Sequence, residues 1–354
     1  MLLDALYERD DVEVILFSDT KLNSLFGPSI NRFEVVQIKN RLIRRLWRPL
    51  LLPLALIVKR AGVFFSSWDK GLPYWSLCPC VYMINDLFSL DDDADSTKKR
   101  HRMFLTFKKE IQTASKILAI SEFTKQDIVR RFGVLPEQIE VIKLDCDRPR
   151  IDKALCAGVD IFDTFSQLRR REYFISVSGR ISDKRKNVFN LIKAYEKYRN
   201  SGKIFCKKKL VIVGGYSPAE DNAASLMRYI EEKGLSSDII FAGYLEDDML
   251  YPLLAGAYAS IFVTKLEGFG IPVLEAFYLG VPLIAADNSA TAEVAGSGAL
   301  PVDAEDVDAI ALSMRNIVEK HELASELIKK AEERLNDYLW QNSVDRIVKI
   351  FKDI

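Results

Sequence analysis

The sequence predicts an α/β protein made of two Rossmann-like, doubly wound domains that face a central cleft. The chain has 354 residues, and hydrophobic cores tend to divide above about 250 residues. In both halves, short apolar runs alternate with segments of helical spacing, which is typical of a parallel sheet covered by helices. Residues 145–171 between the halves are polar and irregular, so we place the domain boundary near Arg171.

The C-terminal half, residues 172–338, shows this alternation most clearly. The predicted buried strands are Tyr173–Ser178, Leu210–Val213, Ile239–Ala242, Ser260–Thr264 and Val281–Ala285. The predicted helices between them are Asn187–Arg199, Ala219–Lys233, Asp247–Ala257 and Pro272–Leu279. Ligands of such folds bind outside the carboxyl ends of the parallel strands, so we expect binding residues in the loops that follow these strands.

The N-terminal half, residues 1–171, repeats the alternation less regularly. The predicted strands are Val12–Phe17, Val63–Ser66, Cys80–Ile84 and Ile117–Ile120, and the predicted helices are Ile38–Lys59, Thr97–Ala114 and Glu122–Phe132. The helical segment Leu2–Tyr7 comes before the first of these strands, although the first strand of a doubly wound sheet is usually central. We therefore expect an N-terminal domain whose first strand is missing or rebuilt.

Residues 339–354 form a third segment. Trp340–Ile354 has the spacing of an amphipathic helix. Because its apolar face needs a partner, we expect this helix to pack back toward the N-terminal domain.

The composition argues against several classes of function. Lys plus Arg and Asp plus Glu are equal at 50 each, so we expect no nucleic-acid partner. His101 and His321 are the two histidines of the sequence, which argues against a metal site rich in imidazole. The longest apolar run, Leu50–Val58, is far shorter than the roughly 20 residues that span a bilayer. The N-terminus also lacks the layout of a signal peptide, so we expect a cytoplasmic protein.

The stretch Glu267–Glu275 directly follows the predicted strand Ser260–Thr264. Gly268 and Gly270 allow the backbone to approach a ligand closely, and Pro272 suits the first position of a helix whose free N–H groups bind anions or hydroxyls. The carboxylates at the two ends of the stretch can accept hydrogen bonds from different hydroxyl groups of one ligand. The alternative is a βα loop without a ligand, in which the second carboxylate only complements the helix dipole.

A second feature follows the predicted strand Tyr173–Ser178. Gly179-Arg180 comes directly after this strand, and Lys186-Asn187 stands six residues later at the start of a helix. Two cations at the carboxyl edge of one sheet can clamp a diphosphate. Taken alone, these cations are better explained as solvated loop charges with Asp183 as a partner. Because the loop with two carboxylates belongs to the same sheet, we expect the two features to form one ligand site.

Several motifs occur in a fixed order along the C-terminal half. They are Gly179-Arg180, Lys186-Asn187, Val213-Gly214-Gly215, Phe241-Ala242-Gly243, Glu267-Gly268-Phe269-Gly270, Glu275-Ala276, Gly280-Val281-Pro282 and Glu293-Val294. This order closely resembles glycosyltransferase family 4, the retaining group 1 glycosyl transferases of the GT-B fold. Several motifs in register are far more specific than one glycine motif. A weaker resemblance extends to Ile84-Asn85-Asp86-Leu87, to Ser121–Asp127 and to Trp340, where the family's returning helix usually begins.

The resemblance implies a retaining glycosyltransferase of the hexosyltransferase type that acts in cell-surface polysaccharide biosynthesis. Its donor would be a UDP- or GDP-linked sugar, and its acceptor a glycan or a lipid-linked molecule. The implied donor-binding residues are Gly179, Arg180, Lys186, Gly243, Glu267, Gly268, Phe269, Gly270, Ile271 and Glu275. In this scheme Arg180 and Lys186 bind the diphosphate, Glu275 the ribose and Glu267 the donor sugar.

The same resemblance implies a catalytic role for Glu267, Arg180 and Lys186. The main catalytic task is to stabilise charge on the departing nucleotide diphosphate, and a single donor of this kind is typically worth about 3 kcal/mol. The scheme requires neither a metal ion nor another cofactor. Asn85 and Asp86 would lie on the acceptor side.

The sequence also departs from the family pattern. Asn85-Asp86 stands where the family usually has His-Asp, Val263-Thr264 where it has Pro-Ser, and Lys143–Asp147 where it has Asn-Gly-Val-Asp. Two alternatives stay open, the first because of Asn85 and the second because fold analogy alone cannot exclude it. One is a catalytically silent subunit that binds a nucleotide sugar or a partner. The other is a GT-B nucleotide-sugar epimerase, although such enzymes usually rely on histidines.

Basic and apolar residues alternate in Lys39–Arg60, which carries seven cations and no acidic residue. Such a segment suggests an anionic membrane surface, and the cations within 98–109 would add to it if they lie on the same face. We therefore expect a peripheral position at the inner membrane face. The alternative is that Leu50–Val58 belongs to the core and the cations solvate one helix face.

Overall fold

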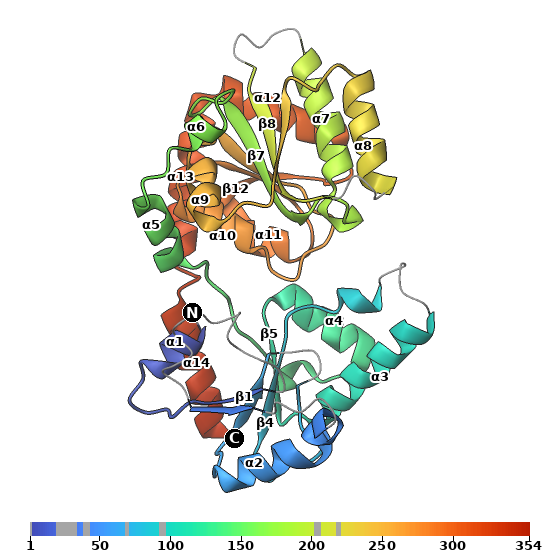
Figure 1. Ribbon diagram of the computed structural model, residues 1–354, viewed down its shortest axis with the longest axis vertical. Helices are drawn as coiled ribbons and strands as arrows, with labels where there is room; N and C mark the ends of the chain where they lie inside the picture. The colour runs from blue at the N-terminus through green and yellow to red at the C-terminus, as the bar shows by residue number, and fades with distance from the viewer. Residues whose placement is uncertain are drawn as a thin grey trace. The chain divides into compact units, whose positions relative to one another are not determined.

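The computed structural model describes residues 2–18, 34–37, 43–67, 71–91, 97–201, 207–216 and 221–354. The chain divides into two compact units, which Figure 1 shows as ribbons. Unit 1 comprises Met1–Leu144 with Leu339–Ile354, and unit 2 comprises Asp145–Tyr338. The final segment, residues 339–354, is therefore grouped with the N-terminal residues.

The division between the units lies earlier in the chain than Arg171. The segment that we expected to be irregular instead contains two helices, α5 (Arg148–Cys156) and α6 (Ile161–Thr164). Both pack on α9 (Asp247–Ala255) of unit 2, and Arg150 of α5 forms an ion pair with Asp247. Asp147 and Asp160 cap the two helices through their side chains, a signal that we missed in this polar stretch.

Unit 2 contains one sheet of six parallel strands in the order β12-β11-β10-β7-β8-β9. The strands are β7 (Tyr173–Arg180), β8 (Lys209–Gly215), β9 (Ile239–Gly243), β10 (Ala259–Phe262), β11 (Leu283–Ala286) and β12 (Ala299–Val302). The strand order changes direction between β7 and β10, which are hydrogen-bonded neighbours. This is the Rossmann order, and ligands of such sheets bind at the point of reversal.

Helices cover both faces of this sheet (Figure 1). Besides α5, α6 and α9 they are α7 (Val188–Asn200), α8 (Asp221–Glu232), α10 (Ile271–Tyr278), α11 (Ser289–Ala295), α12 (Val307–Glu319) and α13 (His321–Leu335). One core cluster joins alternate strand residues such as Leu210 and Ile212 to α7, α8 and α12. Helix α10 packs on β10 and β11. The predicted doubly wound fold of this half is thus confirmed, and β12 is the strand that we did not predict.

Unit 1 has a sheet of four parallel strands in sequence order: β3 (Phe64–Ser66), β4 (Cys80–Ile84), β5 (Lys116–Ala119) and β6 (Ile139–Val141). Its core joins these strands to α3 (Thr97–Thr113) and α4 (Glu122–Phe132). A separate parallel pair consists of β1 (Ile15–Ser18) and β2 (Glu34–Gln37). We predicted neither β2 nor β6, since both are very short.

The ends of unit 1 pack together. Helix α1 (Leu2–Tyr7) contacts α14 (Trp340–Asp353), and Leu6, Val344 and Val348 form their shared core. The helix predicted over Ile38–Lys59 is irregular in its described part. It consists of a 3-10 turn η2 (Ile43–Leu46), a π-helical turn η3 (Trp47–Leu51) and α2 (Leu52–Val58), while 38–42 lie outside the described residues. Pro49 and Pro53 lack the N–H groups that a continuous helix needs.

Candidate functional site

The two loops that sequence motifs singled out follow β7 and β10, the neighbouring strands at which the strand order reverses. Gly179 and Arg180 are the last residues of β7, and both are exposed. Among the described residues, the Arg180 side chain has no hydrogen-bond or ion-pair partner. Its guanidinium is therefore available to a ligand at this edge of the sheet.

The loop after β7 is held by the loop after β10. Lys184–Lys186 form a 3-10 turn, and Asn187 follows it in the left-handed conformation, with φ of 59°. The buried Asn187 amide donates to the carbonyl oxygens of Val263 at 2.9 Å and Ala304 at 2.6 Å. Lys265 N also donates to Arg185 O at 2.8 Å. These bonds fix the position of Lys186 relative to the end of β10.

Lys186 and Glu267 form an ion pair, with 2.7 Å between Nζ and Oε1. The side chains are only 21% and 15% exposed, so the pair is shielded from most solvent. Asp183, which we considered as a partner for the loop cations, binds Arg185 instead at 2.7 Å. Lys186 is one of the two residues predicted to bind the diphosphate. It therefore contacts Glu267, the residue predicted to bind the donor sugar, directly.

The loop between Glu267 and α10 is shaped for close backbone approach. Gly270 is the N-cap of α10 with φ of 115°, a conformation that favours glycine. Phe269 is 4% exposed and packs beneath the loop. Among the described residues, no acceptor is present for the backbone N–H groups of Phe269 and Gly270. Together with Ile271, the first residue of α10, they form a helix N-terminus that favours an anion.

The same loop rests on the N-terminus of α11. Glu267 N donates to Ser289 Oγ at 3.1 Å, and Ala290 N donates to Glu267 O at 3.4 Å. Asn288 Nδ2 donates to Thr264 O at 3.3 Å. We did not predict that Asn288 and Ser289 support this loop, because their short polar side chains carry no motif of their own.

Glu275 lies in α10, one helical turn beyond the loop. Its Oε1 accepts a hydrogen bond of 3.0 Å from the hydroxyl of Tyr251 on α9. Burial raises the pKa of the Glu275 carboxyl, although Tyr251 and Arg150 act in the opposite direction. Gly243, with φ of 69°, ends β9 at the same edge of the sheet. Unit 2 thus carries all ten predicted donor-binding residues at the ends of its strands or in the segments that follow them.

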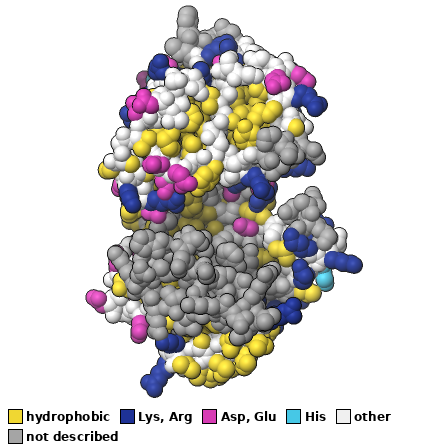
Figure 2. All heavy atoms as spheres, in the orientation of Figure 1, with side chains coloured by type: hydrophobic (Ala, Val, Ile, Leu, Met, Phe, Trp, Pro, Cys, Tyr) yellow, Lys and Arg dark blue, Asp and Glu magenta, His cyan; other side chains and the backbone are white. Residues whose placement is uncertain are grey.

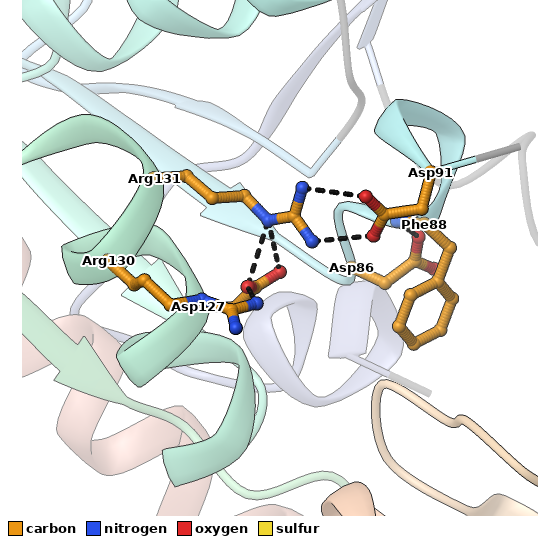
Figure 3. Close-up of polar contacts among 6 residues, drawn as sticks. All are labelled: Asp86, Phe88, Asp91, Asp127, Arg130 and Arg131. Carbon is orange, nitrogen blue, oxygen red and sulfur yellow. Dashed lines mark hydrogen bonds and ion pairs between the residues drawn. The ribbon is translucent and has the colours of Figure 1, made fainter.

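The predicted acceptor-side residues lie in unit 1, directly after β4. Asn85 is exposed, and its Nδ2 lies 3.5 Å from Ser67 O. Asp86 accepts a hydrogen bond of 3.1 Å from Phe88 N, at the start of the turn η4 (Phe88–Leu90) (Figure 3). The Asp86 carboxylate therefore has a structural task.

Three further charged residues hold this turn against α4. Arg131 Nε lies 2.9 Å from both carboxylate oxygens of Asp127, and its terminal nitrogens contact Asp91 at 2.9 Å and 2.5 Å (Figure 3). Asp127 is 7% exposed and also binds Arg130. This network therefore fixes the end of η4 against α4.

Comparisons with known proteins bear on the family and the fold of the chain. A family model described as Glycosyl transferases group 1 matches residues 160–334. The O-antigen chain mannosyltransferase B of Escherichia coli is 25% identical over 242 residues, which cover 68% of this chain and 61% of that protein. The chain thus spans about three fifths of the length of this relative.

Solved structures share the fold. A glycosyltransferase from Rickettsia africae ESF-5 has a TM-score of 0.76 at 14% identity, covering 99% of this chain and 93% of that one. Alr3699/HepE of Anabaena, solved in complex with UDP and glucose, has a TM-score of 0.72 at 17% identity, covering 100% and 95%. Residues 160–334 match the group 1 glycosyl transferases, and the chain, with its two parallel α/β units, has the GT-B fold.

Proposed function

We propose that the protein is a retaining glycosyltransferase that moves a sugar from a nucleotide-diphosphate donor to a glycan or lipid-linked acceptor in cell-surface polysaccharide biosynthesis. The observation that carries the proposal is the Lys186–Glu267 ion pair at the reversal of strand order, beside the exposed Arg180. The two cations, Arg180 and Lys186, and a helix N-terminus can bind a diphosphate, and carboxylates can accept hydrogen bonds from sugar hydroxyls.

The proposed mechanism assigns each residue a task. Bond breakage between the anomeric carbon and the phosphate oxygen leaves charge on the nucleotide diphosphate. Arg180, Lys186 and the amides of Phe269–Ile271 would stabilise that charge, and such a group is worth about 3 kcal/mol in the transition state. Glu267, held by Lys186, would orient the donor sugar, and Glu275 the ribose. We propose that this chemistry needs no metal ion, because fixed cations take its place.

The choice of donor rests on the relatives. The E. coli relative is a mannosyltransferase by name, so mannose is the first sugar to test. Both UDP and GDP conjugates are included, since the base-binding contacts carry no motif in the sequence.

A thermal-shift experiment tests the donor site. The protein is heated with UDP, GDP and their sugar conjugates, beside the Arg180→Ala, Lys186→Ala double variant. The control is Lys184→Ala, Arg185→Ala, which removes two charges from the same turn but leaves the predicted ligands in place. We expect one nucleotide to raise the Tm of the parent and of the control only. Stabilisation that survives in the Arg180, Lys186 variant would refute the diphosphate clamp.

Turnover then separates the proposal from its alternatives. Release of free nucleotide from the sugar conjugate, increased by a glycan or lipid-linked acceptor, supports a transferase. Binding without release supports a silent subunit, and a rearranged donor sugar without acceptor supports an epimerase.

We also propose that unit 1 contacts an anionic membrane surface. Eight of its exposed apolar residues lie on η2, η3, α2 and the neighbouring loop: Leu46, Leu50, Leu54, Ile57, Val58, Tyr74, Trp75 and Leu77. Trp75 Nε1 donates to Pro49 O at 2.9 Å, which holds the loop beside η3. Figure 2 shows hydrophobic side chains gathered at the lower end of the molecule, where Figure 1 places α2. Patches of this kind mark interaction sites.

Cations accompany this apolar patch. Lys109 of α3 places Nζ 3.6 Å from the centre of the Tyr74 ring. One of the cations within 98–109 therefore lies beside the apolar patch. Arg48 does not face a membrane, because it forms an ion pair with the buried Glu110. Lys39, Arg41 and Leu42 lie outside the described residues. No described helix combines the length and apolarity that a membrane span requires.

Liposome flotation tests the membrane proposal. We expect binding to vesicles that contain anionic lipid, reduced about tenfold or more when Ile57, Val58 and Leu77 are replaced by Glu. The control replaces three exposed leucines elsewhere, Leu135, Leu155 and Leu312, by Glu. Equal losses in both variants, or binding that ignores lipid charge, would refute the assignment.

A further inference from the structure

The chain passes between the two units twice, at Leu144/Asp145 and at Tyr338/Leu339. We propose that Arg148 and Tyr338 are positioning residues that couple the loop of residues 267–270, here called the donor loop, to both of these crossings. The inference deepens the proposed function and rests on it, because the proposed function identifies this loop as the one that binds the donor. Its contacts all lie within unit 2.

Arg148 joins the two crossings to each other. Its Nε lies 3.0 Å from Asp145 Oδ2, next to the first crossing. Its Nη2 donates to the carbonyl oxygens of Leu335 at 3.2 Å and Tyr338 at 3.4 Å, at the second crossing. Asp145 is buried and the Arg148 side chain is 26% exposed, so this ion pair is partly shielded from solvent. One guanidinium therefore holds both segments to the same point of unit 2.

Tyr338 joins the second crossing to the donor loop. Its ring packs edge-on against Phe269, with 5.9 Å between the ring centres and an angle of 73°. Its hydroxyl donates to Glu293 O at 3.3 Å and accepts from Arg334 at 3.1 Å. Tyr338 is 1% exposed, and Phe269 is 4% exposed. A shift of the loop backbone at Phe269 would therefore have to move Tyr338 as well, since close-packed interiors leave no free space.

Helix α10, which begins at the donor loop, contacts the first crossing. Cys146 Sγ lies 3.8 Å from Leu274 O, and the Arg148 guanidinium lies 5.5 Å from the centre of the Tyr278 ring. Cys146 is fully buried. The donor loop and its helix thus touch both segments that connect the units.

This arrangement has a physical consequence. Motions between domains concentrate at the few residues that connect them, and hinge residues absorb the change in backbone angles. Here the connecting residues are packed on the element proposed to bind the donor diphosphate. Ligand contacts at the Phe269–Ile271 amides would therefore reduce the mobility of the backbone at the crossings. A loosened crossing would in turn increase the mobility of those amides.

Hydrogen exchange on the whole protein tests the coupling without requiring turnover. The variants are Tyr338→Phe, which removes only the hydroxyl, and Arg148→Lys, which keeps the charge but loses the forked contact. We expect exchange to become about tenfold faster both at the crossings and in residues 268–274. The control is Tyr195→Phe, which removes the hydroxyl of a buried tyrosine bonded to Lys208 O at 3.0 Å.

Faster exchange confined to the crossings, or equally fast exchange in the Tyr195→Phe control, would overturn the coupling. A second readout uses the nucleotide identified by thermal shift. In the parent protein, the nucleotide should slow exchange at residues 143–147 and 335–339, and both variants should lose this effect. Failure of the parent to bind any nucleotide would instead count against the proposed function, while the exchange of the unliganded variants would still decide the coupling.

Discussion

Both units end a buried parallel strand in charged or polar residues, but the two strand ends use these residues differently. In unit 2, Arg180 is exposed and Lys186 is paired with Glu267, beside amides for which no described acceptor is present. In unit 1, the Asp86 carboxylate accepts a hydrogen bond from Phe88 N, and Asp127 and Arg131 form an ion pair. The difference lies in the exposed Arg180 and in the loop amides, which leave hydrogen-bond donors for a ligand in unit 2 beside the paired side chains.

The largest effect should come from removing Lys186. We expect Lys186→Ala to lower turnover roughly 100-fold, because a charge-stabilising donor contributes about 3 kcal/mol in the transition state. Asn85→Ala should change turnover by less than about threefold, since Asn85 is exposed and makes one long side-chain contact. Steady-state assays of both variants measure the difference.

An equal loss in the two variants would break the comparison. It would mean that the amide of Asn85 does take part in the reaction, in the place of the family's imidazole. Thermal unfolding of both variants serves as the control for folding.

The sequence predicted unit 2 better than unit 1, for a physical reason. Strands such as β7 and β8 are long and buried on both faces, so they stand out as continuous apolar runs. The strands β2 and β6 of unit 1 have four and three residues, too few for any periodicity. The π-helical turn Trp47–Leu51, which contains Pro49, was not revealed by the helical spacing of the sequence.

The candidate site shows the same limit. Glycine and proline motifs located the loops, because backbone shape is local and visible in the sequence. The pairing of Lys186 with Glu267, 81 positions apart, depends on which strands are neighbours. Tyr251 and Ser289 were missed for that reason, since their roles exist only after the sheet has formed.

The second prediction concerns the stability of unit 1. We expect Asp127→Ala to destabilise this unit by about 2 kcal/mol, because it removes charge-assisted bonds to two arginines. Asp91→Ala should cost less than about 1 kcal/mol, since that partner is 47% exposed. All four tryptophans of the chain belong to unit 1, so tryptophan fluorescence during urea unfolding reports on it. Equal urea midpoints for the two variants would show that the burial of Asp127 adds nothing to the stability of unit 1.

The third prediction separates function from stability in unit 2. The raised pKa of the Glu275 carboxyl means that folding favours its neutral form. The Glu275 carboxyl therefore stabilises the folded state at low pH. Its contribution to the free energy of unfolding is lost as the pH rises through the raised pKa. Glu275→Gln should therefore raise the Tm of the unliganded protein at pH 7 while weakening nucleotide binding about tenfold.

The pH dependence of binding provides the check on Glu275. In the parent, nucleotide affinity should fall as pH drops toward the raised pKa, because the protonated carboxyl accepts ribose hydroxyls poorly. In Glu275→Gln the affinity should change little over the same range. A parallel fall in both proteins would place the titrating group elsewhere.

The smallest effect compares two buried threonines. The Thr291 hydroxyl in unit 2 is buried and has no partner among the described residues. The Thr124 hydroxyl in unit 1 contacts Ser121 Oγ at 3.0 Å and donates to Asn85 O at 3.3 Å. Replacing an unsatisfied buried hydroxyl by a methyl group of similar shape removes a desolvation cost, so Thr291→Val should stabilise the protein by up to about 1 kcal/mol. Thr124→Val should destabilise it by a similar amount, because it leaves a carbonyl without its donor. Thermal unfolding measures both signs, and destabilisation by Thr291→Val would mean that its hydroxyl binds ordered water beside the donor loop.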